Sequence, residues 1–200
     1  QSRSSAASDV YKRQGIDTNV LNGKRFYYSF LAGAQRIFEH QKAINKINVF
    51  PVQDGDTGTN LASTMRAIIN TYIPTSSLKA TSDALADAAL IGARGNSGII
   101  FAQFIYGFSD KIEADGDNIT VHDFAKALKN AVTYSYESIN NPVEGTMITV
   151  MREWAESIDK LKDKFEDFNE LIAASLSSAR KSLEETPKKL EVLAKAKVVD

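Results

Sequence analysis

The stretch from Asn48 to Asn60 reads NVFPVQDGDTGTN and separates two helical patterns, one that ends near Ile47 and one that begins near Leu61. It contains two carboxylates, two glycines, two threonines and two asparagines, so it is too polar to form part of a core. Its composition is also too specific for a simple linker. We therefore expect an ordered loop that the helices on either side hold in place.

Asp54 and Asp56 are the carboxylates of this loop, and Gly55 lies between them. In a tight turn both carboxylates can face one side, where their mutual repulsion favours a shared cation. Mg²⁺ fits such a pair, because it is usually held by one or two carboxylates together with water and substrate phosphates. The alternative is an ordinary Asp-Gly turn before a Thr or Asn helix cap, which soluble proteins use constantly.

Thr57, Gly58, Thr59 and Asn60 complete the loop where the next helix is expected to begin. The free backbone amides of a first helical turn favour an anion, and glycine lets the backbone approach a ligand closely. The stretch therefore predicts a metal site followed by a turn and a phosphate site.

Most of the chain carries apolar residues at helical spacing, and no convincing alternating strand is present. About eight helices are expected, which predicts an all-α domain. Pro74 is expected to close the second helix, Ser82 to cap the third, and Thr120 with Asp123 to form a capping box. Pro187 is expected to start the last, short helix.

A second glycine-rich loop, GARGNSG at Gly92 to Gly98, precedes a strongly apolar helix. Gly95 and Gly98 would let the backbone approach a ligand, and the amides from Asn96 onward would point at a bound phosphate. Arg94 could hold a phosphate, although a surface arginine or a loop-stabilising ion pair explains it nearly as well. No Gly-Lys-Ser/Thr follows, so the loop is not a Walker motif.

A third loop, from Pro142 to Thr146, places Glu144 and Gly145 shortly before Met147. It could close a nucleotide site from the side opposite the first two loops. An ordinary N-cap by Thr146 after a proline-stiffened turn explains it equally well.

Composition narrows the possible functions. The chain has 200 residues, 43% of them apolar, which suffices for one sizeable domain with a core. Its formal net charge of −1 offers no bulk attraction to nucleic acid or to an anionic membrane. With no cysteine and two histidines, any metal should be bound by oxygen. No apolar run approaches the ~20 residues that span a bilayer and no secretory signal is visible, so a cytoplasmic location without membrane insertion is expected.

The two ends of the chain differ from its middle. Residues 1–15 show no apolar periodicity and are expected to be a disordered extension or an artefact of the sequence. Residues 16–200 are expected to form one domain. The stretch from Lys197 to Asp200 holds an apolar pair with no cap or turn, so we expect that a longer protein was cut here.

The three stretches NVFPVQDGDTGTN, GARGNSGII and NPVEGTMITV, in this order and at this spacing, resemble a known kinase family. That family is the nucleotide-binding domain of the bacterial fatty acid kinase catalytic subunit, which is related to the ADP-binding subunit of dihydroxyacetone kinase. The resemblance covers roughly residues 16–200 and implies an eight-helix antiparallel barrel with ATP or ADP at one rim. Gln53 departs from the pattern, because the family usually has proline there; the change alters loop stiffness but removes no ligand.

The resemblance also implies roles for individual residues. Asp54 and Asp56 would hold one or two Mg²⁺ ions that bridge the nucleotide phosphates. Asn48 would join them as a metal ligand, at the position where the dihydroxyacetone kinase relatives supply a third aspartate. The remaining matches are nucleotide contacts, to phosphate by Thr59, Asn60, Ser97 and Gly98, and to the nucleoside by the loop that contains Thr146 and Met147.

The implied reaction transfers the γ-phosphoryl group of ATP to the carboxylate of a fatty acid, which a separate fatty-acid-binding protein presents, and gives an acyl phosphate. Positioning and charge neutralisation dominate such catalysis, and a carboxylate nucleophile needs no strong general base at neutral pH. The family continues with a middle domain and a carboxy-terminal domain associated with dimerisation and carrier binding. This chain alone is therefore expected to bind Mg-nucleotide yet to transfer phosphate poorly or not at all.

Three other functions stay open at this point. A dihydroxyacetone kinase subunit is the nearest, but its fingerprint has an aspartate and a histidine where this chain has Asn48 and Thr57. A non-catalytic nucleotide-binding regulatory domain is the second, and the retained acidic pair, Asn60 and Ser97 argue against it. A purely helical scaffold is the third, and it leaves the polar loops unexplained.

Overall fold

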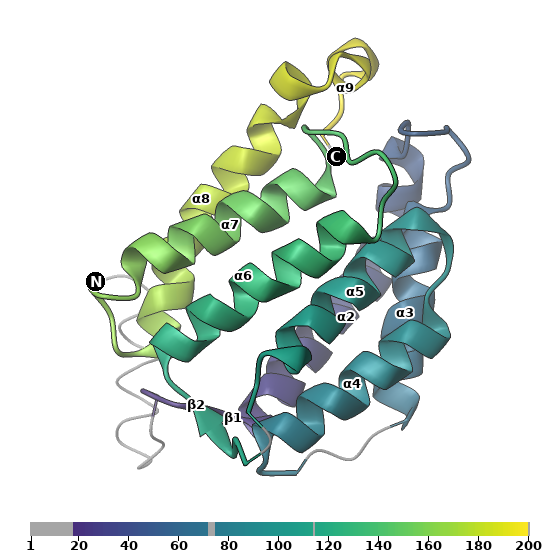
Figure 1. Ribbon diagram of the computed structural model, residues 1–200. Helices are drawn as coiled ribbons and strands as arrows, with labels where there is room; N and C mark the ends of the chain where they lie inside the picture. Colours follow the sequence, from purple (N-terminus) through teal and green to yellow (C-terminus); the bar gives the residue numbers. More distant parts are fainter. Residues whose placement is uncertain (1–17, 72–74, 114, 200) are drawn as a thin grey trace.

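The computed structural model describes residues 18–71, 75–113 and 115–199, in which eight helices account for most of the chain (Figure 1). The expectations placed on residues 1–15 and on Pro74 lie outside the described residues. The strands β1 Leu21–Asn22 and β2 Asn118–Ile119 pair antiparallel over two residues each. The all-α prediction is confirmed, with a two-stranded ribbon as a small addition to it.

The helices from α2 to α8 alternate in direction, and each contacts the next along the chain (Figure 1). This is the expected antiparallel barrel. The bounds are α2 Gly23–Ile47, α3 Thr57–Thr71, α4 Leu78–Gly92, α5 Gly95–Asp110, α6 Val121–Glu137, α7 Met147–Leu161, α8 Phe168–Lys189 and α9 Glu191–Ala196.

The start of the described chain meets the start of α8, which brings the first and last long helices together. Phe168 N donates to Thr18 O at 2.9 Å, and Thr18 Oγ1 donates to Asp167 Oδ2 at 2.5 Å. The Arg25 guanidinium lies 5.9 Å from the centre of the Phe168 ring. A segment far from α8 in the sequence therefore closes this end of the helix arrangement.

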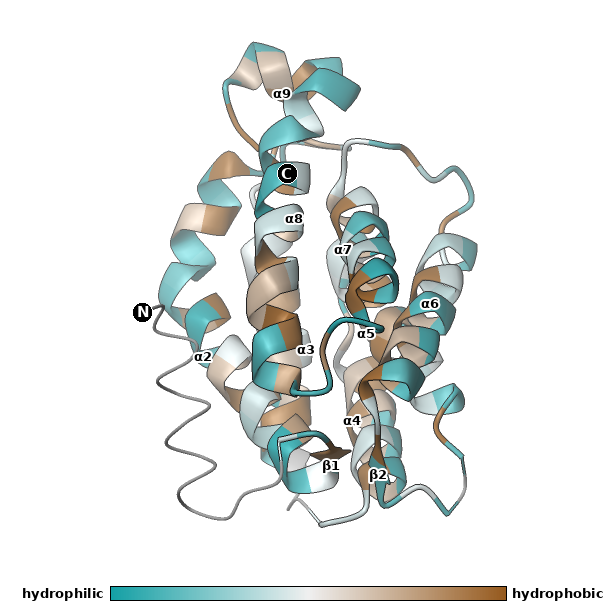
Figure 2. Ribbon diagram, turned by 90° about the vertical axis from the view of Figure 1, so that its left-hand side faces the viewer, coloured by the Kyte–Doolittle hydropathy of each residue, from teal (hydrophilic) through white to brown (hydrophobic). Residues whose placement is uncertain are grey.

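Two apolar clusters form the core. One joins α5 to α8 around Phe108, Phe124 and Phe168, whose neighbouring ring centroids lie 5.7 and 5.5 Å apart. The other joins α2 to α5 and includes Ile68. Phe26 packs against both clusters and stacks on Phe108 at 5.1 Å, so α2 links the two halves. Apolar and hydrophilic segments alternate along the helices, as one-sided burial requires (Figure 2).

Two predicted helix starts are wrong by about one turn. The helix α3 begins at Thr57, and not near Leu61, because residues from α2 hold its first turn, as described below. The helix α4 begins after Ser77, whose side chain accepts from the backbone of the first turn. Ser82, the predicted cap, is buried inside the helix and donates to a carbonyl of the preceding turn.

The predicted capping box is confirmed, because Thr120 and Asp123 exchange both of its hydrogen bonds. The prediction for Pro187 is wrong, since α8 continues through it to Lys189. Pro187 cannot donate to the carbonyl of Leu183, four residues earlier. That carbonyl instead accepts from the Thr186 hydroxyl at 2.8 Å, which lets the helix pass the proline without an unsatisfied acceptor. None of the described helices is both long and apolar enough to cross a membrane.

Candidate nucleotide site

A cavity of about 780 Å³ lies where α2 ends and where α3, α5 and α7 begin. All three loops singled out in the sequence contribute to its wall. Ten of the predicted site residues line it, namely Asn48, Asp54, Asp56, Thr57, Asn60, Gly95, Asn96, Ser97, Thr146 and Met147. The alternation of helix direction therefore brings together loops that are about 40 residues apart in the chain.

Asn48 is nearly buried and holds the first loop in shape. Its Oδ1 accepts from the backbone N–H groups of Asp56 at 3.0 Å and Thr57 at 3.3 Å. Its Nδ2 lies 3.4 Å from the carbonyl of Phe50 and 3.3 Å from that of Val52, and donates to both. Both ends of the amide are therefore engaged within the loop. Its predicted role as a metal ligand stays a prediction, and the structure gives it a second role in positioning.

Thr59 was expected to contact phosphate, but it does not line the cavity. Its hydroxyl accepts from Asn45 Nδ2 at 2.9 Å and from Gln41 Nε2 at 3.2 Å, and its N–H donates to Asn45 Oδ1 at 3.0 Å. Gln41 and Asn45 of α2, and Asn48 directly after it, are spaced i, i+4, i+7, so they follow one face of the helix. This row of amides caps the start of α3, and its spacing is a signal that the loop-centred sequence analysis missed.

Four other predicted contacts also lie off the cavity wall. Arg94 turns back and donates to the carbonyls of Ile91 and Ala93, at 3.2 and 2.6 Å, so it satisfies the end of α4. The three glycines serve close packing between elements. A Cβ would come 2.4 Å from a carbonyl of α2 at Gly58, 3.0 Å from a side chain of α3 at Gly98, and 2.8 Å from Leu190 at Gly145.

Gly95 has φ +58°, a conformation that favours glycine, and it begins α5 at the cavity. A Cβ there would lie 2.2 Å from Asn60 Nδ2, so the Asn60 side chain packs directly against this backbone. The first turns of α3 and α5 are thereby held against each other.

Two of the helices that begin at the cavity, α5 and α7, lack the side-chain caps found at the opposite end of the barrel. The amino ends of α2, α4, α6 and α8 lie together at the end opposite the cavity, and each donates a backbone N–H to the side chain that caps it. At the cavity, α5 and α7 begin without any side-chain cap. Their free N–H groups and helix dipoles leave partial positive charge at this rim, the arrangement that binds anions.

Ser97 lies in the uncapped first turn of α5 and lines the cavity. Its Oγ is buried, and it has no hydrogen-bond partner among the described residues. A buried hydroxyl without a partner is costly unless a ligand or water satisfies it. It is therefore placed to donate to an anion bound at the end of α5.

Asp54 and Asp56 line the same cavity, and no hydrogen bond or ion pair is found for either carboxylate within the described residues. No group of three or more His, Cys, Asp or Glu side chains able to hold a metal occurs in the part of the chain that the structure describes. A pair of carboxylates fits Mg²⁺ in the form that completes its coordination with water and substrate phosphates, and does not fit a closed protein cage.

Most of the remaining wall is apolar. Ile44 and Ile47 of α2, Phe50 and Val52 of the first loop, and Ile139 and Val143 beyond α6 all line the cavity. The sequence analysis did not assign them to the site, because apolar residues in loops carry no periodic signal and those of α2 fit an ordinary helix face. A polar side formed by carboxylates and helix ends thus faces an apolar surface that could hold a ring system.

Glu144, in the third loop, accepts three side-chain hydrogen bonds. Thr149 Oγ1 donates at 2.6 Å, Tyr136 OH at 2.8 Å and Arg152 Nη2 at 3.0 Å. Burial alone would raise the pKa of Glu144, but these three donors outweigh it and hold the pKa below its usual value. Burial also raises the pKa of Tyr136, so at neutral pH an ionised glutamate accepts from a neutral phenol.

Comparison with known proteins shows which family the chain resembles. Residues 51–200 match the DAK2 domain. The chain is 40% identical over 187 residues to protein YloV of Bacillus subtilis, covering 92% of this chain and 34% of YloV. It is 38% identical over 184 residues to an uncharacterised protein of Staphylococcus saprophyticus, and 34% identical over 183 residues to one of Staphylococcus aureus. In both staphylococcal comparisons, 90% of this chain and 33% of the relative are covered. The chain thus spans about a third of the length of the curated relatives it matches.

Proposed function

This chain belongs to the DAK2 domain family, and on that basis we propose that its cavity binds ATP or ADP with Mg²⁺ as the nucleotide domain of a fatty acid kinase. DAK2 domains occur in kinase-related proteins and bind ADP or ATP. The fatty acid acceptor, the metal and the assignment of each residue are parts of the proposal.

The observation that carries the proposal is the uncapped start of α5. Three consecutive N–H groups, from Gly95 to Ser97, begin the helix without a side-chain cap, and Ser97 Oγ beside them has no partner within the described structure. Phosphate oxygens would accept from these groups and would meet the positive end of the helix dipole. Both features lie on the cavity wall.

The acidic pair supports a metal-bound nucleotide. Asp54 and Asp56 would repel bare phosphates in the same cavity, so a nucleotide needs a cation between itself and the two carboxylates. Neutralisation of phosphate charge is the chemistry that bound Mg²⁺ supplies. Asn48 would keep the loop in the shape that presents both carboxylates, since it fixes the backbone at Asp56 and Thr57.

The size and lining of the cavity also suit a nucleotide. Ligand pockets typically measure about 300–1,000 Å³ and combine apolar walls with a few placed polar groups. The apolar residues from α2 and from the α6–α7 connection would hold the nucleoside, and the helix ends would hold the phosphates.

In the reaction we propose, the chain's contribution is positioning. The amides of α5 and the Ser97 hydroxyl would hold the phosphates, and Asp54 and Asp56 would hold a Mg²⁺ ion that neutralises phosphate charge. A fatty acid carboxylate would attack the γ-phosphorus in line, the bond to the bridging oxygen of ADP would break, and acyl phosphate would form. The acceptor is ionised at neutral pH, so no residue of this chain has to remove a proton.

The acceptor is proposed to arrive on a separate fatty-acid-binding protein. The chain matches about a third of the length of its relatives. We expect the part of those relatives that it does not match to contribute to carrier docking and to homodimer formation. The chain alone should therefore bind nucleotide but transfer phosphate poorly. Robust acyl phosphate formation by this chain plus carrier would contradict that expectation.

The first test is a calorimetric titration of ADP into the chain, with and without Mg²⁺. We expect binding that requires Mg²⁺, that is lost in Asp54→Asn, and that weakens in Ser97→Ala. Asp115→Asn is a matched control, because this exposed carboxylate lies in the loop between α5 and β2 and does not line the cavity. Binding unaffected by Asp54→Asn, or absent in the unmodified chain, would refute the proposed site. Binding of Mg-ADP without phosphoryl transfer by the full-length relative would favour a regulatory domain.

A further inference from the structure

The connection between α6 and α7, residues 138–146, contains the third loop and forms one side of the cavity. Between α6 and α7, Ile139, Asn140, Asn141 and Val143 all line the cavity. No side-chain hydrogen bond is found for Asn140 or Asn141 in the described structure. The shape of this wall must therefore be set by contacts elsewhere in the loop.

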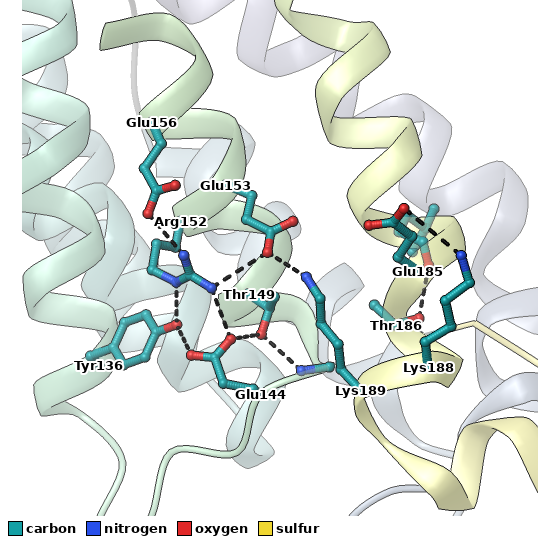
Figure 3. Close-up of polar contacts among 12 residues, drawn as sticks. Tyr136, Glu144, Thr149, Arg152, Glu153, Glu156, Glu185, Thr186, Lys188 and Lys189 are labelled. Carbon is teal, nitrogen blue, oxygen red and sulfur yellow. Dashed lines mark hydrogen bonds and ion pairs between the residues drawn. The ribbon is translucent and has the colours of Figure 1, made fainter. Parts of the chain in front are cut away.

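Glu144 supplies such contacts, and it does not itself line the cavity. Its three donors come from the end of α6 and from the first two turns of α7, so they tie the loop to both helices (Figure 3). Next to it, Gly145 N donates to Thr149 Oγ1 at 2.9 Å. The hydroxyl of Thr149 thus accepts from the loop backbone and donates to the loop carboxylate.

Tyr136, Glu144, Thr149 and Arg152 form one hydrogen-bonded group, which we call the Arg152 cluster. Arg152 Nη2 donates to Glu144 at 3.0 Å, its Nε to Tyr136 OH at 3.1 Å and its Nη1 to Glu156 at 2.8 Å (Figure 3). The side chain is 33% exposed, so water screens it only in part. Three partners in three directions require the planar fork of a guanidinium, which lysine cannot reproduce.

The cluster continues to the end of α8. Arg152 Nη2 lies 3.5 Å from Glu153 Oε1, and that carboxylate pairs with Lys189 (Figure 3). The backbone of Gly145, at φ +85°, packs against Leu190, which follows α8. The loop is therefore held by α6, α7 and the α8–α9 link together.

We propose that Arg152 is a positioning residue for nucleoside binding, because it fixes Glu144 and through it the α6–α7 wall of the cavity. The inference rests on the proposed function, since it assumes that this wall contacts the nucleoside. The phosphate side depends on other contacts, those of α5 with Asn60 and of α3 with α2. None of these contacts involves the Arg152 cluster. The two halves of a nucleotide should therefore respond differently when Arg152 is changed.

The test compares ADP with inorganic pyrophosphate, both in the presence of Mg²⁺, by calorimetry on the chain and its variants. For Arg152→Ala we expect the Kd for ADP to rise about tenfold. This corresponds to about 1.4 kcal/mol, which lies within the range of interaction energies between residues in contact. The Kd for pyrophosphate should change less than about twofold. Arg152→Lys should restore little of the loss, because one ammonium cannot serve three partners.

A milder variant guards against a general loss of folding. Tyr136→Phe removes one hydroxyl and should raise the Kd for ADP in the same direction, again with pyrophosphate unaffected. Arg36→Ala is the matched control, because Arg36 forms an ion pair with Glu39 on the exposed face of α2. It should leave both Kd values unchanged.

The outcomes separate the inference from the function on which it rests. Equal weakening of ADP and pyrophosphate in Tyr136→Phe, or unchanged ADP affinity in Arg152→Ala, would refute the positioning role. Absence of ADP binding by the unmodified chain would instead overturn the proposed function. Hydrogen exchange that accelerates at the amides of residues 139–146 in Arg152→Ala, and not in Arg36→Ala, would support the inference independently.

Discussion

Replacement of Asn48 separates two roles that this residue could have, as a metal ligand or as the group that holds the first loop. Asn48→Ala removes an acceptor shared by two backbone N–H groups and a donor to two carbonyls. Loss of a helix cap costs about 0.5–2 kcal/mol. The donor contacts are long, at 3.3 and 3.4 Å, so each should add only about 0.5 kcal/mol or less.

We therefore expect Asn48→Ala to reduce the free energy of unfolding by about 2 kcal/mol, which for a chain of this size lowers the unfolding midpoint by roughly 4–8 °C. The measurement is thermal unfolding by circular dichroism in EDTA, without nucleotide, so that no metal contributes. Asn48→Asp should be intermediate. Its carboxylate still accepts from the start of α3, where a negative charge is favoured, but it loses both donor contacts and adds charge beside Asp54 and Asp56.

A direct ligand role predicts the opposite pattern. Asn48→Ala would then leave the metal-free midpoint within about 1 °C of the unmodified chain and would abolish only the Mg²⁺ dependence of ADP binding. Asn48→Asp would strengthen that dependence, since a third carboxylate would join the metal. Such a result would refute the reasoning from the hydrogen bonds, which places the main effect in the metal-free protein.

Three further predictions follow from the same structure. Asp56→Asn, like Asp54→Asn, should remove the Mg²⁺ dependence of ADP binding in calorimetry. It should not lower the metal-free unfolding midpoint, because no partner of either carboxylate is found in the described residues. A lower midpoint would show a structural role. Gly145→Ala should destabilise the chain by about 1–3 kcal/mol in denaturant unfolding, since φ is +85° and the new Cβ would meet its neighbours at 2.8 Å. Gly33→Ala should be neutral or stabilising, because Gly33 lies in the middle of α2 and a Cβ there would meet no neighbouring atom. Because the pKa of Glu144 is lowered in the folded state, its contribution to stability is present above about pH 4.3 and is lost as the pH falls further through the folded-state value. Glu144→Gln should make unfolding less steeply dependent on pH in that acid range, and an unchanged acid slope would contradict this.

The sequence by itself determined the helical class, the three loops and ten of the residues that line the cavity. Local rules suffice for these features: apolar spacing marks a helix, and Thr120 with Asp123 is a capping box at fixed separation. The chemistry of the Asp54–Asp56 pair is likewise local, because the two residues are neighbours in one turn. These predictions needed no knowledge of where other segments lie.

Only the tertiary structure decided which of the polar residues face the cavity. Thr59 and Arg94 have side chains that could contact phosphate. In the structure, however, Thr59 is hydrogen-bonded to side-chain amides of α2, and Arg94 donates to carbonyls at the end of α4. Similarly, the sequence analysis did not single out Arg152, whose contacts with Tyr136 and Glu144 exist only in the folded chain. A side chain has one set of partners at a time. The partners of Arg94 are carbonyls close by in the chain, whereas Thr59 and Arg152 have partners 18 and 8 residues away. The barrel also fixes helix direction, so the amino ends of α3, α5 and α7 share one rim, and no single helix carries that information in its sequence.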